Sequence, residues 1–132
     1  MDEYKAFLAE VRKSTELNML VPDDEGLVAV RVDDRFTLCL QYIERTGEIL
    51  CVVEVARLDA DAPKEIYRQL LSAGMFGRDT AGGYFAIDPQ TEMVVYNYYF
   101  GFAAVAGNVE GFVSALGNIL SLCEIWAERI GG

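Results

Sequence analysis

The segment from Gly82 to Phe100, GGYFAIDPQTEMVVYNYYF, constrains the fold more than any other part of the chain. Its second arm, EMVVYNYYF, has apolar or aromatic side chains at nearly every position, whereas a strand with one wet face alternates apolar and polar residues. The run EILCVVEVARL at 48–58 is also apolar on both faces. Two such strands predict a sheet that needs cover on both sides.

Periodicity in the first half of the chain predicts a helix followed by three strands. Residues 3–17 have helical spacing, and β-branched runs at 27–33, 36–43 and 48–58 are separated by short polar turns. The turns Asp33-Asp34 and Arg45-Thr46-Gly47 fit hairpin loops, so the three strands form an antiparallel meander. The apolar stripe of the first helix consists of Tyr4, Phe7, Leu8, Val11 and Thr15.

The second half repeats the pattern with one strand fewer. A helix opens at Asp61-Ala62-Pro63, with Asp61 as its expected N-cap, and fades toward Gly74 and Gly77. Strands at 83–88 and 92–100 form a hairpin that turns at Pro89. A closing helix is expected from its cap at Asn108 to about residue 130.

No repeat or linker divides the 132 residues, so we expect one α+β domain spanning 1–132. Its order is helix, three antiparallel strands, helix, two strands, helix. Three modest helices can cover one face of a five-stranded sheet and only part of the other. At about 25 cal/mol per Å², several wet apolar side chains would cost several kcal/mol, which is comparable with the net stability of a domain. A second copy, a partner chain or both should therefore cover the remaining surface.

Composition narrows the choice of partner and compartment. With 21 acidic and 11 basic residues the net charge is −10, which disfavours nucleic acid and favours solubility or basic, amphipathic polypeptides. The three cysteines have no CxxC spacing, so we expect reduced thiols that serve as small core residues in a cytoplasmic protein. The N-terminus lacks the apolar core of a secretory signal, and the uncharged run 93–109 is too short and interrupted for a membrane span.

Few residues offer chemistry. The chain has no histidine, which excludes histidine-based catalytic triads and histidine metal sites, and its glycine clusters lack a phosphate-loop lysine. We expect no cofactor and no metal. Asp88 beside Tyr84 or Tyr96 could transfer protons, but an aspartate before proline is also what a turn prefers. The aromatic run from Tyr96 to Phe102 reads as core, as a protein interface or, least favoured, as a ring-stacking ligand pocket.

Several features of the chain together resemble one known family. They are its small size, its acidity, the order of its elements, the stretch MFGRDTAGGYFAIDPQTEMVVYNYYF at 75–100 and the closing LGNILSLCEIWAERI at 116–130. The chain resembles the class I type III secretion chaperones, also called the Tir chaperone family, over nearly its whole length. It departs from that family in lacking a pronounced acidic C-terminal tail, since it ends in ERIGG.

The resemblance implies a homodimer without enzymatic activity. Such chaperones hold the extended N-terminal segment of a secreted effector until export, and some relatives bind regulators of secretion genes instead. The second helix would carry the dimer contact through Ile66, Leu70, Leu71 and Met75. The first helix and the sheet would offer apolar client-binding residues, namely Phe7, Leu8, Val11, Leu38, Leu40 and Val53. Each of these ten residues also fits a place in an ordinary core.

Two other functions remain open at this level. One is a regulatory adaptor of the same fold that binds a secretion regulator. The other is a small ligand-binding or enzymatic α+β domain built around Asp88 and the tyrosines.

Overall fold

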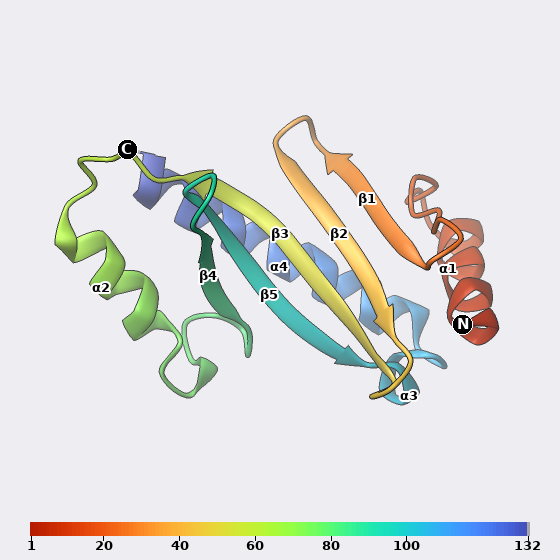
Figure 1. Cartoon of the computed structure of the whole chain (residues 1–132). Helices are drawn as coiled ribbons and strands as arrows, with labels where there is room; N and C mark the ends of the chain where they lie inside the picture. Colours follow the sequence, from red (N-terminus) through yellow and green to blue (C-terminus); the bar gives the residue numbers. More distant parts are fainter. Residues whose placement is uncertain (132) are drawn as a thin grey trace.

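The computed structural model describes residues 1–131 and has the expected order of elements (Figure 1). Two short elements were not anticipated: the 3-10 turn Met75–Gly77 after the second helix, and the four-residue helix α3. The bounds are α1 Asp2–Ser14, β1 Leu27–Val32, β2 Phe36–Ile43, β3 Glu48–Arg57, α2 Lys64–Ala73, β4 Tyr84–Asp88, β5 Met93–Gly101, α3 Phe102–Val105 and α4 Val109–Gly131.

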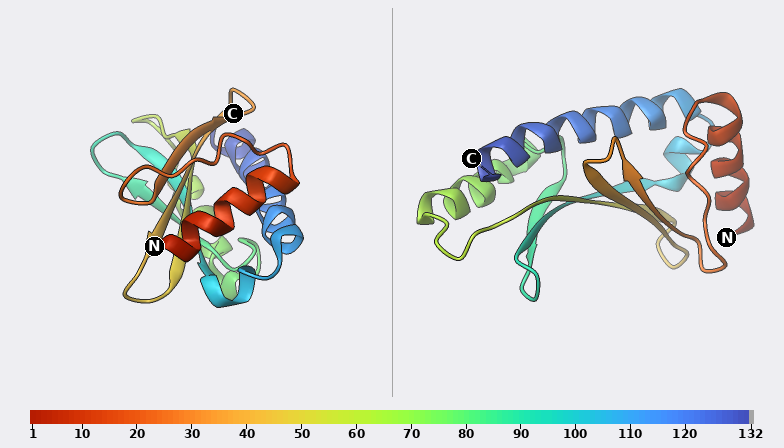
Figure 2. Two further views of the ribbon diagram at one scale, coloured as in Figure 1. Left: turned by 90° about the vertical axis from the view of Figure 1, so that its right-hand side faces the viewer. Right: turned by 90° about the horizontal axis from the view of Figure 1, so that it is seen from above.

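The five strands form one antiparallel sheet in the order β1-β2-β3-β5-β4. The first three strands are the predicted meander, and the β4–β5 hairpin joins it through β5. The long helix α4 runs diagonally across one face, while α1 lies beyond β1 and α2 beyond β4 (Figures 1 and 2). No helix within residues 1–131 lies across the opposite face. We call the α4 side the covered face and the other side the open face.

The covered face holds the core because its side chains meet α4 in register. One row across the sheet runs Val30, Leu38, Val53, Tyr96 and Phe85, one residue from each strand. The buried positions of α4 fall at three- and four-residue steps, which is the spacing that keeps them on the sheet. They are Phe112, Leu116, Ile119, Cys123 and Trp126.

The hairpin turns show why the strands end where they do. The Arg35 amide donates to the Val32 carbonyl at 3.0 Å, and the two central residues of this turn, Asp33 and Asp34, have positive φ of 52° and 57°, as a type I′ turn requires. In the second turn Gly47 takes φ 69°. The Asn108 carboxamide oxygen accepts a hydrogen bond from the Gly111 amide at 3.0 Å, so this residue caps α4 as expected.

Two sequence-based expectations were wrong in detail. The first helix ends at Ser14 rather than near residue 17, because the Thr15 hydroxyl bonds the Val11 carbonyl at 2.6 Å and accepts from the Leu17 amide at 3.1 Å. Asp61 does not cap α2, which has Pro63 at its N-cap and no side-chain cap. The proline already fixes the entry of the chain into the helix.

Candidate functional site

The open face is a surface of the sheet that no helix among residues 1–131 covers (Figures 1 and 2). Three rows cross it in register: Ala29, Cys39, Val52, Asn97 and Tyr84; then Leu27, Gln41, Leu50 and Tyr99; then Arg31, Thr37, Glu54, Val95 and Ala86. Cys39, Leu50, Val52 and Val95 at its centre are only half-buried, although they lie in the middle of the sheet. Two tyrosines at its β4–β5 side, Tyr84 and Tyr99, are 46% and 43% exposed. This face is therefore apolar and available for contact.

One acid lies in the middle of this apolar face. Glu54 on β3 is half-buried between Thr37 and Val95, and it makes no ion pair within the part of the chain that the structure describes. Burial, and second the negative charge of Glu54, raise the pKa of the Cys39 thiol. Thr37 and Val95 flank Glu54 in its row, and Arg31 one strand further on donates to the Thr37 hydroxyl at 3.3 Å. A half-buried carboxylate with no ion-pair partner among residues 1–131 favours a partner that brings a basic residue.

The six predicted client-binding residues lie in or at the core. Leu8, Val11, Leu40 and Val53 are fully buried against the chain's own elements. Leu38 also lines a pocket of about 320 Å³, and Phe7 lines a shallower hollow between α1 and α3. Their role toward a client stays a prediction, and Leu38 is the one that reaches a sizeable apolar pocket.

That pocket lies between the end of α1, the edge strand β1 and the middle of α4. Its walls are almost entirely apolar, so it suits aliphatic side chains of an extended segment. Strand β1 pairs only with β2, which leaves its outer edge free of strand pairing. The lining residues are Thr15, Glu16, Leu17, Met19, Leu20, Val32, Leu38, Val113, Leu116, Gly117 and Leu120.

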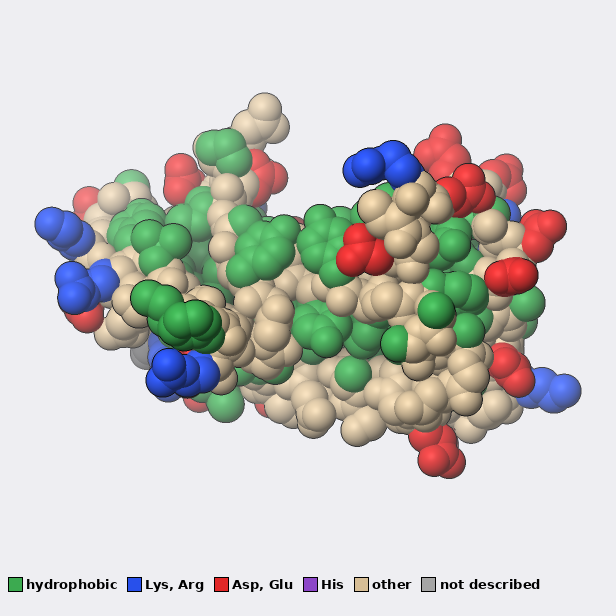
Figure 3. All heavy atoms as spheres, turned by 90° about the horizontal axis from the view of Figure 1, so that it is seen from below, with side chains coloured by type: hydrophobic (Ala, Val, Ile, Leu, Met, Phe, Trp, Pro, Cys, Tyr) green, Lys and Arg blue, Asp and Glu red, His purple; other side chains and the backbone are tan. Residues whose placement is uncertain are grey.

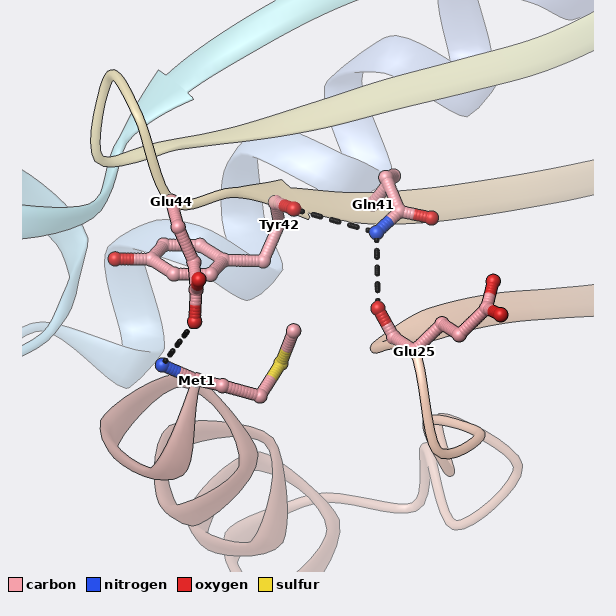
Figure 4. Close-up of polar contacts among 5 residues, drawn as sticks. All are labelled: Met1, Glu25, Gln41, Tyr42 and Glu44. Atoms are coloured by element: carbon pink, nitrogen blue, oxygen red, sulfur yellow. Dashed lines mark hydrogen bonds and ion pairs between the residues drawn. The ribbon is translucent and has the colours of Figure 1, made fainter.

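The α1 end of the molecule is fixed by aromatic stacking and polar contacts. Tyr4 stacks on Tyr42 with ring centroids 5.1 Å apart and donates its hydroxyl hydrogen to the Gly26 carbonyl at 3.0 Å. The Met1 ammonium pairs with Glu44 at 3.2 Å, and Gln41 donates to the Glu25 and Tyr42 carbonyls, both at 3.2 Å (Figure 4). These contacts fix the start of α1, and near the pocket beyond its end the Arg12 guanidinium donates to the Leu20 carbonyl at 2.6 Å.

The four predicted dimer residues divide into two pairs. Ile66 and Leu70 are 8% and 5% exposed because they pack against β4 and the end of α4. Leu71 and Met75 are 79% and 63% exposed. The second pair offers most of its surface to another molecule, whereas Leu70 can be reached only as part of the wall of a pocket between α2 and β4. The role of all four residues in a dimer stays a prediction.

Sequence reasoning missed the most exposed large apolar residue of this region. Phe76, 87% exposed, follows Met75 in the 3-10 turn and has a positive φ of 56°. Its signal in the sequence is an aromatic residue between Gly74 and Gly77, where a turn needs no aromatic side chain. Figure 3 shows exposed hydrophobic side chains beside Lys and Arg at the end of the molecule where α2 lies.

The groups considered for chemistry have structural roles. The Asp88 carboxylate accepts the Gln90 amide at 2.9 Å in the expected turn, and the side chain is exposed. Burial raises the pKa of the Cys51 and Cys123 thiols to about 12, so both are protonated core residues. No cluster of acid and cysteine side chains within residues 1–131 could hold a metal ion.

By length and composition, α4 is the one helix among residues 1–131 that could cross a membrane. This is weak evidence for a membrane span, since core helices pass the same test. Here α4 lies along the sheet and buries five side chains against it.

Comparison with known proteins gives a family and a fold. The family model described as the Tir chaperone protein (CesT) family matches residues 6–127. No curated protein sequence is significantly similar to the chain. Among solved structures, a chain of the ExsC–ExsE complex is 24% identical, with a TM-score of 0.81, and the match covers 96% of this chain and 92% of that one.

Two further structures have the same fold. The HopA1–SchA chaperone–effector complex contains a chain with 21% identity and a TM-score of 0.79, covering 96% of this chain and 94% of that one. The heterodimeric ExoU–SpcU complex from the type III secretion system of Pseudomonas aeruginosa gives 18% identity and a TM-score of 0.61, covering 96% and 93%.

Proposed function

This chain belongs to the Tir chaperone protein (CesT) family, and from that premise we propose that it binds the extended N-terminal segment of a type III secreted effector and keeps it competent for export. The observation that carries the proposal is the uncovered apolar face of the sheet in a chain whose family match covers residues 6–127. Two structures with the same fold are a chaperone–effector complex and a complex from a type III secretion system.

The mechanism is binding alone, without catalysis. An extended segment adds main-chain hydrogen bonds along the free edge of β1, and its apolar side chains enter the pocket beside Val32 and Leu38. The rest of the segment wraps over the open face, where Glu54 receives a basic residue. Because the segment loses conformational entropy when it becomes ordered, a large wrapped surface is needed for useful affinity.

The proposed chaperone is a homodimer in the cytoplasm. Leu71 on the exposed side of α2 and Met75 in the turn beyond its end contact the second copy, while Ile66 and Leu70 hold the helix against its own chain. The three cysteines are unpaired, which suits a reducing compartment.

Purification of the tagged chain from its native host under secreting conditions tests the proposal. We expect the N-terminal region of an effector to copurify in stoichiometric amount. A transcription regulator in its place would overturn the effector role and support the adaptor. A bound small molecule, or no bound protein, would contradict both.

A matched pair of variants locates the binding surface. Val52→Glu puts a charge at the centre of the open face and should weaken effector binding about tenfold or more, equivalent to about 1.4 kcal/mol. Ser121→Glu adds the same charge on the exposed side of α4, on the opposite side of the molecule, and should leave binding unchanged. If the two variants bind the effector with equal affinity, the open face is not part of the effector-binding surface.

A further inference from the structure

Phe76 combines two costly properties that nothing within its own chain explains. It is 87% exposed, and its φ of 56° and ψ of 18° lie in the left-handed region that bulky side chains rarely adopt. Holding a non-glycine residue there costs about 1–3 kcal/mol, and such residues gather at binding and switch sites. The Arg78 guanidinium lies 5.8 Å from the ring centroid, and most of the ring faces solvent. The turn therefore holds an aromatic ring where another molecule could reach it.

The loop that presents Phe76 is pinned to the sheet. The Tyr96 hydroxyl on β5 donates to the Thr80 carbonyl at 2.6 Å, and the Thr80 hydroxyl donates to the Gly83 carbonyl at 2.6 Å. Thr80 is fully buried. Gly77 has φ 64°, and a side chain there would lie 2.9 Å from the Gly82 backbone, so the turn is closely packed. An anchor held in this way loses little conformational entropy on binding.

A pocket of suitable size and lining lies beside the same helix. It has a volume of about 180 Å³ and opens between α2 and β4. Cavities of roughly 150 Å³ with aliphatic and aromatic walls take up benzene, so a phenyl ring fits a pocket of this size. Phe76 is not part of the pocket of its own chain. The lining residues are Tyr67, Leu70, Leu71, Phe85, Ala86 and Ile87.

We propose that Phe76 of one copy fills the α2–β4 pocket of a second copy, and that the second copy returns the same contact. A two-fold axis makes such an interface from one anchor and one pocket on each chain. If two α2 helices pair antiparallel about Leu71, residue 76 of one lies opposite residues 66 and 67 of the other, and Tyr67 lines the pocket. This contact rests on the homodimer of the proposed function, and Phe76 is the residue that anchors that homodimer.

An antiparallel pairing sets the two helix dipoles in opposite directions. Exposed side chains of both signs lie near the two ends of α2, with Asp61, Lys64 and Glu65 at its start and Arg78 and Asp79 beyond its end, so acidic and basic groups of the two copies can pair in this arrangement.

Two complementary variants test the anchor and the pocket. Phe76→Ser removes the anchor, and Leu71→Trp enlarges an exposed side chain in the pocket wall so that it fills the pocket. Each should raise the dimer dissociation constant about 30-fold or more, measured by sedimentation without any client. Mixing the two should restore part of the dimer, because one chain then supplies a pocket and the other an anchor. Val21→Ser, which changes another residue that is 59% exposed, is the control and should not alter the mass.

A third variant separates an anchor from a residue needed for folding. Phe76→Gly should raise the melting temperature of the monomer, because glycine adopts positive φ without steric cost, and it should still weaken the dimer. A lower monomer melting temperature together with an unchanged dimer would overturn the inference. So would a wild-type chain that is monomeric, or a mixture of Phe76→Ser and Leu71→Trp that stays monomeric.

These results are independent of the test of the proposed function. A wild-type chain that binds an effector segment, with a Phe76→Ser variant that remains fully dimeric, overturns the anchor alone. A wild-type dimer that loses its pairing with Phe76→Ser but binds no effector overturns the chaperone role and leaves the anchor intact.

Discussion

Helices α1 and α2 lie at opposite ends of the sheet, and the chain uses their apolar faces differently. All four apolar stripe residues of α1 that fall within the helix are buried: Tyr4, Phe7, Leu8 and Val11. Helix α2 buries Ile66, Leu70 and Ala73 but leaves Leu71 exposed, and Met75 and Phe76 beyond its end are exposed too.

The difference follows from what each helix packs against. Helix α1 is enclosed by β2, α3 and α4, with Phe7 against the rings of Phe102 and Phe112. Helix α2 has only the five-residue edge strand β4 and the end of α4 beside it. Two amphipathic helices therefore give a buried helix at one end of the sheet and a partly exposed helix at the other.

Replacing leucine by alanine in each helix should give the largest difference between the two ends of the sheet. Leu8→Ala should lower the free energy of unfolding by about 2–5 kcal/mol, because it leaves a cavity in a packed core. Leu71→Ala should cost less, and its cost should vanish on dilution, because it removes contacts only between copies. Urea unfolding at several protein concentrations measures both. A concentration-independent loss for Leu71→Ala would show that this side chain packs within its own chain.

Two buried tyrosine hydroxyls offer a matched test of smaller effect. Tyr4 donates to the Gly26 carbonyl at 3.0 Å at the α1 end, and Tyr96 donates to the Thr80 carbonyl at 2.6 Å beneath the loop at the α2 end. Replacing either by phenylalanine should cost about 1–3 kcal/mol, because a buried carbonyl loses its partner. Only Tyr96→Phe should also weaken dimerisation, since only that bond holds the turn that carries Phe76.

The pH dependence of these two variants follows from burial, which raises the pKa of both hydroxyls above the usual value. A group with a raised folded-state pKa contributes stability below the unfolded-state pKa, about 10 for tyrosine, and loses it as pH rises. Stability of the wild type should therefore fall above about pH 10 more steeply than that of Tyr4→Phe or Tyr96→Phe. Equal slopes would contradict the assigned burial of the hydroxyls.

The smallest effect concerns the two faces of the sheet. Cys39 on the open face is half-buried, whereas Cys51 and Cys123 on the covered side are fully buried with pKa values of about 12. A thiol reagent should modify the native chain at Cys39 alone, and Glu54→Gln should speed the reaction by removing a neighbouring negative charge. Mass spectrometry locates the modification, with Cys39→Ser as the control. Modification of Cys51 at the same rate would contradict the assignment of faces.

The order of helices and strands could be predicted from the sequence because each element has a local signal. The paired aspartates at 33 and 34, the glycine at 47 and the asparagine at 108 all occupy the turns and the cap predicted for them. Local sequence patterns gave the wrong helix ends where two local signals compete for the same helix end. Proline at 63 replaced the expected Asp61 cap, and the threonine at 15 ended α1 early.

The candidate surface was harder to predict, because periodicity identifies an apolar stripe without saying what covers it. Leu8 and Leu71 occupy similar positions in their helices, yet their exposures are 0% and 79%. The difference depends on how far the sheet extends beneath each helix, which is a property of the whole fold. Phe76 was missed because its position outside regular periodicity gave no pattern to interpret.

The solution mass of the wild-type chain beside Leu71→Asp tests the central claim most directly. Leu71 is 79% exposed, so the charge should not unfold the chain, whereas Leu70→Asp would place a charge at a site that is 5% exposed. The wild type should sediment with twice the mass of one chain, and Leu71→Asp should sediment as a folded single chain. A wild type with the mass of one chain, or a Leu71→Asp variant that keeps the wild-type dimer mass, would contradict the account.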